Sequence, residues 1–209
     1  MAIVSSIPVY QHYAQRAFLE RWNRSGKLYL FDKEQRLPQP KSIQSARSIF
    51  GLEDMQTASM ENAFSDVERS IGYTDHSGEI KEPAKIHIFA KWIALHLVRN
   101  RAHAPNLAGR DYQAQVDSMA NSLVQYHAAF QDFKADVLIT GDNPVVPFTG
   151  TEDFFIAPLS PRRCLYLMPE SRFPTEDGGL LFRPSTINQF VYNAATRHCL
   201  SFDKNMHLP

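Results

Sequence analysis

Two glutamates have a spacing that suits acid–base or metal chemistry. Glu61 and Glu68 are seven positions apart, which is about two helical turns, so both carboxylates would project from one face of a helix predicted over residues 60–71. Paired carboxylates can hold a divalent cation such as Mg²⁺ or Mn²⁺, or share general acid and base work. The alternative is a solvated helix face that carries ordinary surface acids.

Arg99 is the candidate for stabilising negative charge. It lies on a strongly apolar helix predicted to begin at Pro83, in one stripe with Trp92, His96 and His103, and a guanidinium buried with that helix requires an anionic partner. One interpretation is a structural ion pair with Glu61, Glu68 or Asp142. The other is an anion site, in which the planar guanidinium binds a phosphate or carboxylate.

His12 is the candidate for proton transfer. It is predicted in the first helix, one turn before Arg16, and a histidine can act as a general base near neutral pH. A helical histidine can equally be a packed or capped residue. The catalytic interpretation requires Glu61, Glu68 and Arg99 to lie close to it in space.

Asp142 and Asn143 stand where an apolar run ends. The segment ITGDNPVVPFTG, residues 139–150, passes from a predicted strand into Asp-Asn-Pro, which forms tight turns because Asp and Asn bond the local backbone and Pro fixes the next φ. Strand ends also carry many functional polar groups. Asp142 is therefore a candidate catalytic residue and, with Glu61 and Glu68, a candidate metal ligand. Asn188, near the start of the last predicted helix, is a candidate partner of the turn.

Composition excludes several classes of function. The 209 residues include 22 basic and 22 acidic side chains, so the net charge is zero and nothing indicates nucleic acid or an anionic membrane as a partner. The N-terminus has no basic leader and no apolar run of membrane length. The two cysteines, Cys164 and Cys199, show no metal-ligand spacing and are expected to be buried thiols of a cytoplasmic protein.

The elements that must position these residues indicate an α+β fold. Apolar residues from Tyr10 to Trp22 recur at helical spacing, as do those over residues 60–71, 83–97 and 112–130. Residues 27–32 predict a strand, and residues 33–44 and 73–82 predict connectors. Short apolar runs at 137–140, 154–157, 164–168 and 180–182 then predict an antiparallel meander, followed by a helix over 186–198 and a strand near 200–202. We expect a single domain over 1–209, with a helical portion over about 1–133 packed on a β-rich portion over about 134–209.

Several segments together resemble the domain of unknown function 4238 family of bacterial and fungal proteins. They occur in the expected order and cover nearly the whole chain: HYAQRAFLERW (12–22), LYLFDK (28–33), MENAFSDVE (60–68), WIALHLVRN (92–100), GDNPV (141–145), PLSP (158–161) and INQFVYNAATRHCLS (187–201). The resemblance selects Glu61, Glu68, Asp142 and Asn143 as site residues, and it supplies no reaction. The chain departs from the family pattern at six positions: Ala14, Gln15, Arg16, His96, Asn100 and Gly141. At the position of Gly141, family members usually have Ser or Thr.

Two functions of different classes follow. In the first, the protein is a hydrolase of a phosphoester or nucleotide, with Glu61, Glu68 and Asp142 holding a divalent cation, His12 assisting and Arg99 stabilising developing charge. In the second, it is a non-catalytic binding or regulatory module, from a mobile element or a defence system, in which the same residues form a structural polar network. An open cleft lined by these side chains would favour the hydrolase, and their burial with mutual hydrogen bonds would favour the module.

Overall fold

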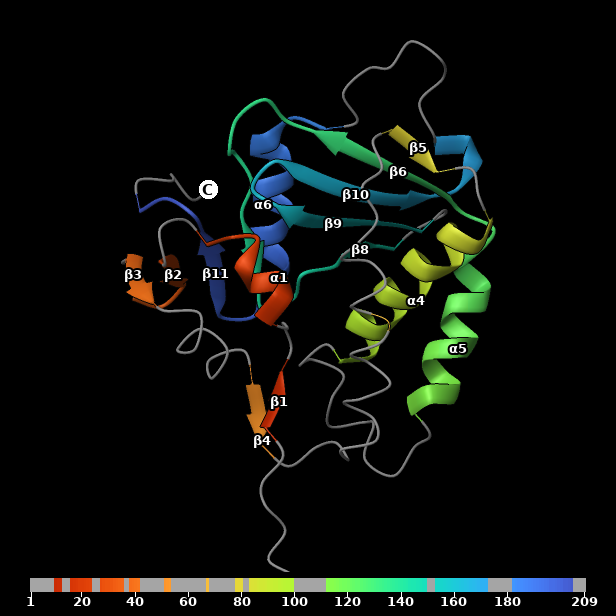
Figure 1. Ribbon diagram of the computed structural model, residues 1–209, viewed down its shortest axis with the longest axis horizontal. Helices are drawn as coiled ribbons and strands as arrows, with labels where there is room; N and C mark the ends of the chain where they lie inside the picture. Colours follow the sequence, from red (N-terminus) through yellow and green to blue (C-terminus); the bar gives the residue numbers. More distant parts are fainter. Residues whose placement is uncertain are drawn as a thin grey trace, which may run out of the picture.

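Helices and antiparallel strands make up the fold, and the predicted α+β class is confirmed (Figure 1). The computed structural model describes the following residues: 10–12, 16–23, 27–35, 38–41, 51–53, 67, 78–80, 83–99, 112–149, 153–172 and 182–204.

The largest sheet has five antiparallel strands. Their order is β5 (Gly78–Ile80), β6 (His127–Asp132), β10 (Arg163–Met168), β9 (Phe154–Ser160) and β8 (Val146–Phe148). The central strands β9 and β10 are buried along almost their whole length, because they are covered on both faces, which explains their continuous apolar sequences. The strands predicted over 154–157 and 164–168 are therefore confirmed.

A second sheet joins the two ends of the chain. Its order is β3 (Pro38–Lys41), β2 (Leu28–Asp32), β11 (His198–Ser201) and β7 (Thr140–Gly141). The C-terminal strand β11 pairs on one side with the N-terminal strand β2, which confirms the strand predicted over 27–32, and on the other side with β7. The N-terminal portion thus contributes strands as well as helices. A separate pair is formed by β1 (Tyr10–His12) and β4 (Gly51–Glu53).

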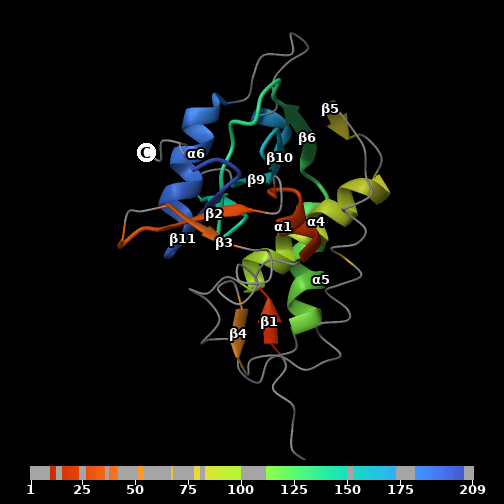
Figure 2. The same ribbon diagram turned by 60° about the vertical axis from the view of Figure 1, so that its left-hand side comes forward.

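Four α-helices that lie whole within the described residues accompany the sheets. They are α1 (Arg16–Glu20), α4 (Pro83–Arg99), α5 (Tyr112–Leu123) and α6 (Pro184–Ala194), and a short 3-10 turn, η2 (Glu170–Arg172), follows β10. In both ribbon views α4 and α5 lie side by side (Figures 1 and 2). The apolar faces of α4 are buried around most of its circumference, as its sequence predicts. Helix α6 packs against β7 and β8.

The first helix is shorter than its apolar spacing predicts. Residues Tyr10–His12 are not helical but form β1, in register with Gly51–Glu53. Pairing with a distant strand satisfies the backbone groups of this segment, and such non-local contacts override a local helical pattern. The prediction holds within α1 and just beyond it, where Phe18 and Trp22 are buried.

Two predicted connectors contain edge strands. Residues 33–44 include β3, and residues 73–82 include β5. Strand β3 carries Pro38 and Pro40, which suggest a loop in a sequence. An edge strand tolerates proline because only one of its sides bonds a neighbour, so the missing N–H groups can face away from the sheet.

Other element boundaries also differ from the prediction. Helix α5 ends at Leu123, and Phe130 lies in β6, where its ring meets Phe89 edge-on with centroids 5.3 Å apart. Of the strand predicted over 137–140, only Thr140 is in β7, because the amides of residues 137 and 138 bond the carbonyl of Pro161 instead. Helix α6 ends at Ala194, and β11 begins at His198 and ends at Ser201.

Two further segments were predicted from apolar residues. Phe182 lies in a bend rather than a strand, while residues 180 and 181 are outside the described ranges. The helix predicted over 60–71 is also outside them except at Val67, which is helical and half-buried.

Candidate functional site

The predicted site residues are described to different extents. Asp142 and Asn143 are described in full, directly after β7. His12 is the last residue of β1, not part of a helix, and Arg99 is the last residue of α4, but the side chains of both lie outside the described part. Glu61 and Glu68 lie outside the described residues altogether. The proposed convergence of all six side chains therefore stays a prediction.

Asp142 binds the turn that connects α6 to β11. Its carboxylate accepts three backbone hydrogen bonds, from Thr196 to Oδ1 at 2.8 Å and from Arg197 and His198 to Oδ2 at 2.8 and 3.0 Å. The amide of Asp142 itself donates to the carbonyl of His198 at 3.0 Å. Three successive amides that point at one anion form a nest. Here the anion is a side chain of the same protein, and Asp142 is only 7% exposed.

Asn143 bonds the same turn from its other end. Its Nδ2 donates to the carbonyl of Ala194 at 2.7 Å and to Oγ1 of Thr196 at 3.3 Å. The carbonyl groups in the last turn of a helix have no partner within the helix. Asn143 supplies one such partner, and it too is 7% exposed.

Lys33 supplies further donors to the end of α6. Its Nζ donates to the carbonyls of Tyr192 and Ala195 at 2.9 and 2.7 Å and lies 4.8 Å from the centroid of the Tyr192 ring. A cation is favourable at this end because the helix dipole is negative there. Asn143 follows β7 and Lys33 follows β2, so residues after two different strands bond the C-terminal end of α6.

Asn188 bonds the chain just before the Asp142 turn. Its Nδ2 donates to the carbonyl of Val137 at 2.8 Å, and its Oδ1 accepts from the amide of Ile139 at 3.0 Å. Asn188 thus bonds the irregular segment that precedes β7 and not, as predicted, the Asp142 turn itself. Buried backbone groups require such partners where no ladder is available.

Gly141 is explained by the closeness of the same turn. A Cβ atom at this position would lie 3.0 Å from Cβ of Ala195 and 3.5 Å from the carbonyl oxygen of His198. This contact is tighter than ordinary van der Waals packing. At Gly141, β7 thus approaches Ala195, the C-cap residue of α6, too closely for a larger side chain.

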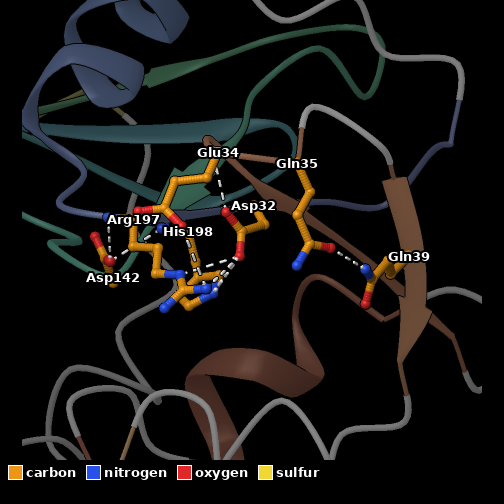
Figure 3. Close-up of polar contacts among 7 residues, drawn as sticks. All are labelled: Asp32, Glu34, Gln35, Gln39, Asp142, Arg197 and His198. Carbon is orange, nitrogen blue, oxygen red and sulfur yellow. Dashed lines mark hydrogen bonds and ion pairs between the residues drawn. The ribbon is translucent and has the colours of Figure 1, made fainter.

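A second polar cluster lies where β2 ends and β11 begins (Figure 3), and its residues are not among the site candidates from the sequence. Asp32 Oδ2 accepts from Nε of Arg197 at 3.0 Å, and Nη2 of Arg197 is also 3.0 Å from it. The Nε2 atom of His198 lies 3.6 Å from the same oxygen, and Glu34 lies 3.6 Å from Nη2 of Arg197. Asp32 and Arg197 are 165 positions apart in sequence, so no local sequence motif contains both.

The charge of Asp32 is stabilised within this cluster. Desolvation raises the pKa of Asp32, but the amide of Glu34 at 2.9 Å and the guanidinium of Arg197 lower it by more. The pKa of Asp32 consequently lies below its ordinary value. Asp32 is an ionised partner for Arg197 and His198 at neutral pH.

The Asp32–His198 pair has the residue types of a catalytic dyad but not the geometry. The Nε2 atom faces Asp32 at 3.6 Å, which is too long for a hydrogen bond. The other ring nitrogen, Nδ1, is buried from solvent. A general base must reach the proton of a bound substrate, and the buried Nδ1 atom is not placed to do so.

The cysteines and carboxylates offer no other reactive centre in the described part of the chain. Cys164 and Cys199 are free and buried, as predicted. Burial and the nearby charge of Asp142 raise the pKa of Cys199 to about 12, and burial likewise raises the pKa of Cys164, so both thiols are protonated and poorly nucleophilic. No group of three His, Cys, Asp or Glu side chains that could hold a metal occurs among the described residues. None of the described helices is long and apolar enough to cross a bilayer.

Comparisons with known proteins add no relative. No family model matches the chain, and searches of curated proteins and of solved structures found no match. The similarity to the domain of unknown function 4238 family therefore stays a prediction from the sequence motifs alone.

Proposed function

We propose that the protein is a non-catalytic binding or regulatory module, in which the conspicuous polar residues hold the fold together. The observation that supports this proposal best is the carboxylate of Asp142. Both of its oxygens accept amide hydrogen bonds from the α6–β11 turn, and the residue is almost fully buried. Burial with complete hydrogen bonding is what a structural carboxylate requires.

The same bonds argue against a metal at Asp142. A carboxylate has about four lone-pair positions, and three are used by the amides of residues 196–198. A cation at this carboxylate would also lie next to three N–H groups whose positive ends point at it. Electrostatic repulsion from the nest would therefore weaken Mg²⁺ or Mn²⁺ binding.

The hydrolase is the second candidate function. It depends on Glu61, Glu68, His12 and Arg99, and on Asp142 leaving the nest to act as a base or ligand. We also propose that the module belongs to a mobile element or a defence system.

A turnover assay distinguishes the two functions. Wild-type protein and Asp142→Asn would be incubated with chromogenic phosphate mono- and diesters, with and without Mg²⁺ or Mn²⁺. The module predicts no hydrolysis above the background of the buffer in either protein. Metal-dependent hydrolysis by the wild type, lost in an Asp142→Asn protein that is still folded, would contradict the module and support the hydrolase.

A further inference from the structure

Arg197 and His198 face the same carboxylate oxygen of Asp32 (Figure 3). This oxygen, Oδ2, lies 3.0 Å from both Nε and Nη2 of Arg197 and 3.6 Å from Nε2 of His198. The other oxygen, Oδ1, accepts the amide of Glu34 at 2.9 Å. A carboxylate oxygen has about two lone-pair positions, and the guanidinium already uses those of Oδ2. The two basic side chains therefore compete for one acceptor.

The charges around His198 are unequal while its ring is neutral. Among the described residues, the charged side chains that lie beside it or bond the same turn come from the ends of β2 and β7 and from the turn itself: Asp32, Lys33, Glu34, Asp142 and Arg197. Three carboxylates thus stand against two cations. A proton on His198 supplies the third cation, which favours the charged form of its ring.

Glu34 offers Arg197 a second acceptor. Its Oε2 lies 3.6 Å from Nη2 of Arg197, and the side chains of Glu34 and Arg197 are 75% and 46% exposed, so both have room to change their rotamers. The side chains of His198 and Asp32 are only 12% and 7% exposed, so the surrounding residues hold them in place. Of the two competing cations, the guanidinium is therefore the one that can move.

We propose that this cluster is a pH-sensitive switch, in which a proton on His198 moves Arg197 from Asp32 to Glu34. Protonation draws Nε2 of His198 to Oδ2 of Asp32 and converts their 3.6 Å separation into a charge-assisted hydrogen bond. Arg197 then gives up its place on Oδ2 and binds the carboxylate of Glu34. Histidine changes its charge between about pH 5 and pH 8, so the surface beside the α6–β11 turn presents a different arrangement of charge at the two ends of this range.

An NMR titration from about pH 8 to about pH 5 tests the switch. The proteins would be the wild type, Asp32→Asn and Glu34→Gln, with the ring of His87 on α4 as the internal control in each. In the wild type, the ring resonances of His198 and the Nε–H resonance of Arg197 should change with one shared midpoint. In Asp32→Asn the midpoint of His198 should fall by about one pH unit or more, because the carboxylate that stabilises the imidazolium is lost.

Glu34→Gln should lower the midpoint of His198 by a smaller amount, since Arg197 loses the acceptor to which it moves. The midpoint of His87 should be the same in all three proteins. Because Glu34 is exposed, this variant is expected to fold even where Asp32→Asn does not.

Three results would overturn the switch. The first is a midpoint of His198 that is the same in folded Asp32→Asn as in the wild type. The second is an Arg197 Nε–H resonance that does not change while His198 titrates, which would mean that both cations stay on Asp32. The third is an unchanged midpoint of His198 in Glu34→Gln. The titration does not measure turnover, so failure of the switch is distinguishable from failure of the proposed function.

Discussion

At the scale of single residues, Asp142 and Asn143 show how a motif can suggest chemistry while its side chains bind backbone. The sequence identified both residues, since an acid and an amide before a proline at a strand end are conspicuous. It did not identify their partners, because Thr196, Arg197 and His198 are more than fifty positions away. Their roles depend on long-range contacts, which no local pattern encodes.

Gly141 allows a prediction about the same turn. Gly141→Ala should lower the free energy of unfolding by about 1–3 kcal/mol, because its Cβ would lie 3.0 Å from Cβ of Ala195. The double variant with Ala195→Gly should recover part of this loss, since it removes the atom that is overpacked. Urea denaturation of the single and double variants measures the coupling. Additive effects of the two substitutions would show that the contact with Ala195 does not limit the size of the side chain at position 141.

Asp32 gives the fold a pH dependence of known sign. Its folded-state pKa is lowered, so its charge stabilises the fold above the unfolded pKa of about 3.9 and this contribution is lost as the pH falls through the folded value. The stability difference between the wild type and Asp32→Asn should shrink as the pH falls below about 4, where the carboxylate takes up its proton. Denaturation across this range, with exposed Glu170→Gln as control, provides the measurement. A difference that grows below about pH 4 would contradict the assignment.

At the scale of elements, the sequence predicted best where the residues bury a whole face. Helix α4 and strands β2, β9 and β10 have apolar patterns that match their burial. Strands β1 and β5 were missed because they are short, and their stability comes from pairing with distant strands rather than from their own composition. Strand β3 pairs with the preceding strand β2. The prolines in β3 indicated a loop, and that prediction is wrong for Pro38–Lys41.

Lys33 carries a prediction for the end of α6. Lys33→Met should lower the free energy of unfolding by about 1–2 kcal/mol, because two carbonyls at the negative end of the helix lose a charged donor. Lys204→Met, which changes an exposed lysine, should have an effect within about 0.5 kcal/mol. Chemical denaturation of both variants compares them. Equal effects would mean that the contacts of Lys33 with α6 add nothing to stability.

At the scale of the whole molecule, the two ends of the chain complete one sheet. Strand β11 lies between β2 and β7 (Figure 1), so the four-stranded sheet cannot form until the C-terminal strand is present. The predicted division into a helical portion and a β-rich portion does not describe this sheet, whose strands come from both. Such non-local pairing is the part of a topology that composition and periodicity reveal least.

A truncation tests this dependence. A chain that ends at Arg197 lacks β11 and removes the hydrogen-bond partners of both β2 and β7. We expect it to lose cooperative thermal unfolding, because the sheet is then split and the buried side chains of Cys199 and Leu200 are absent. Circular dichroism and calorimetry would show the loss. A cooperative transition close to that of the full chain would contradict this view of the fold.

The central claim is that Asp142 is a structural anion, and its most direct test is the stability of Asp142→Asn. The substitution keeps the size of the side chain but leaves one acceptor oxygen, so at least one of the three amides that bond Asp142 must face an NH2 group. We predict a loss of about 3 kcal/mol in the free energy of unfolding, with Glu170→Gln unchanged within about 0.5 kcal/mol. An Asp142→Asn protein as stable as the wild type would contradict the claim and return Asp142 to the list of catalytic candidates.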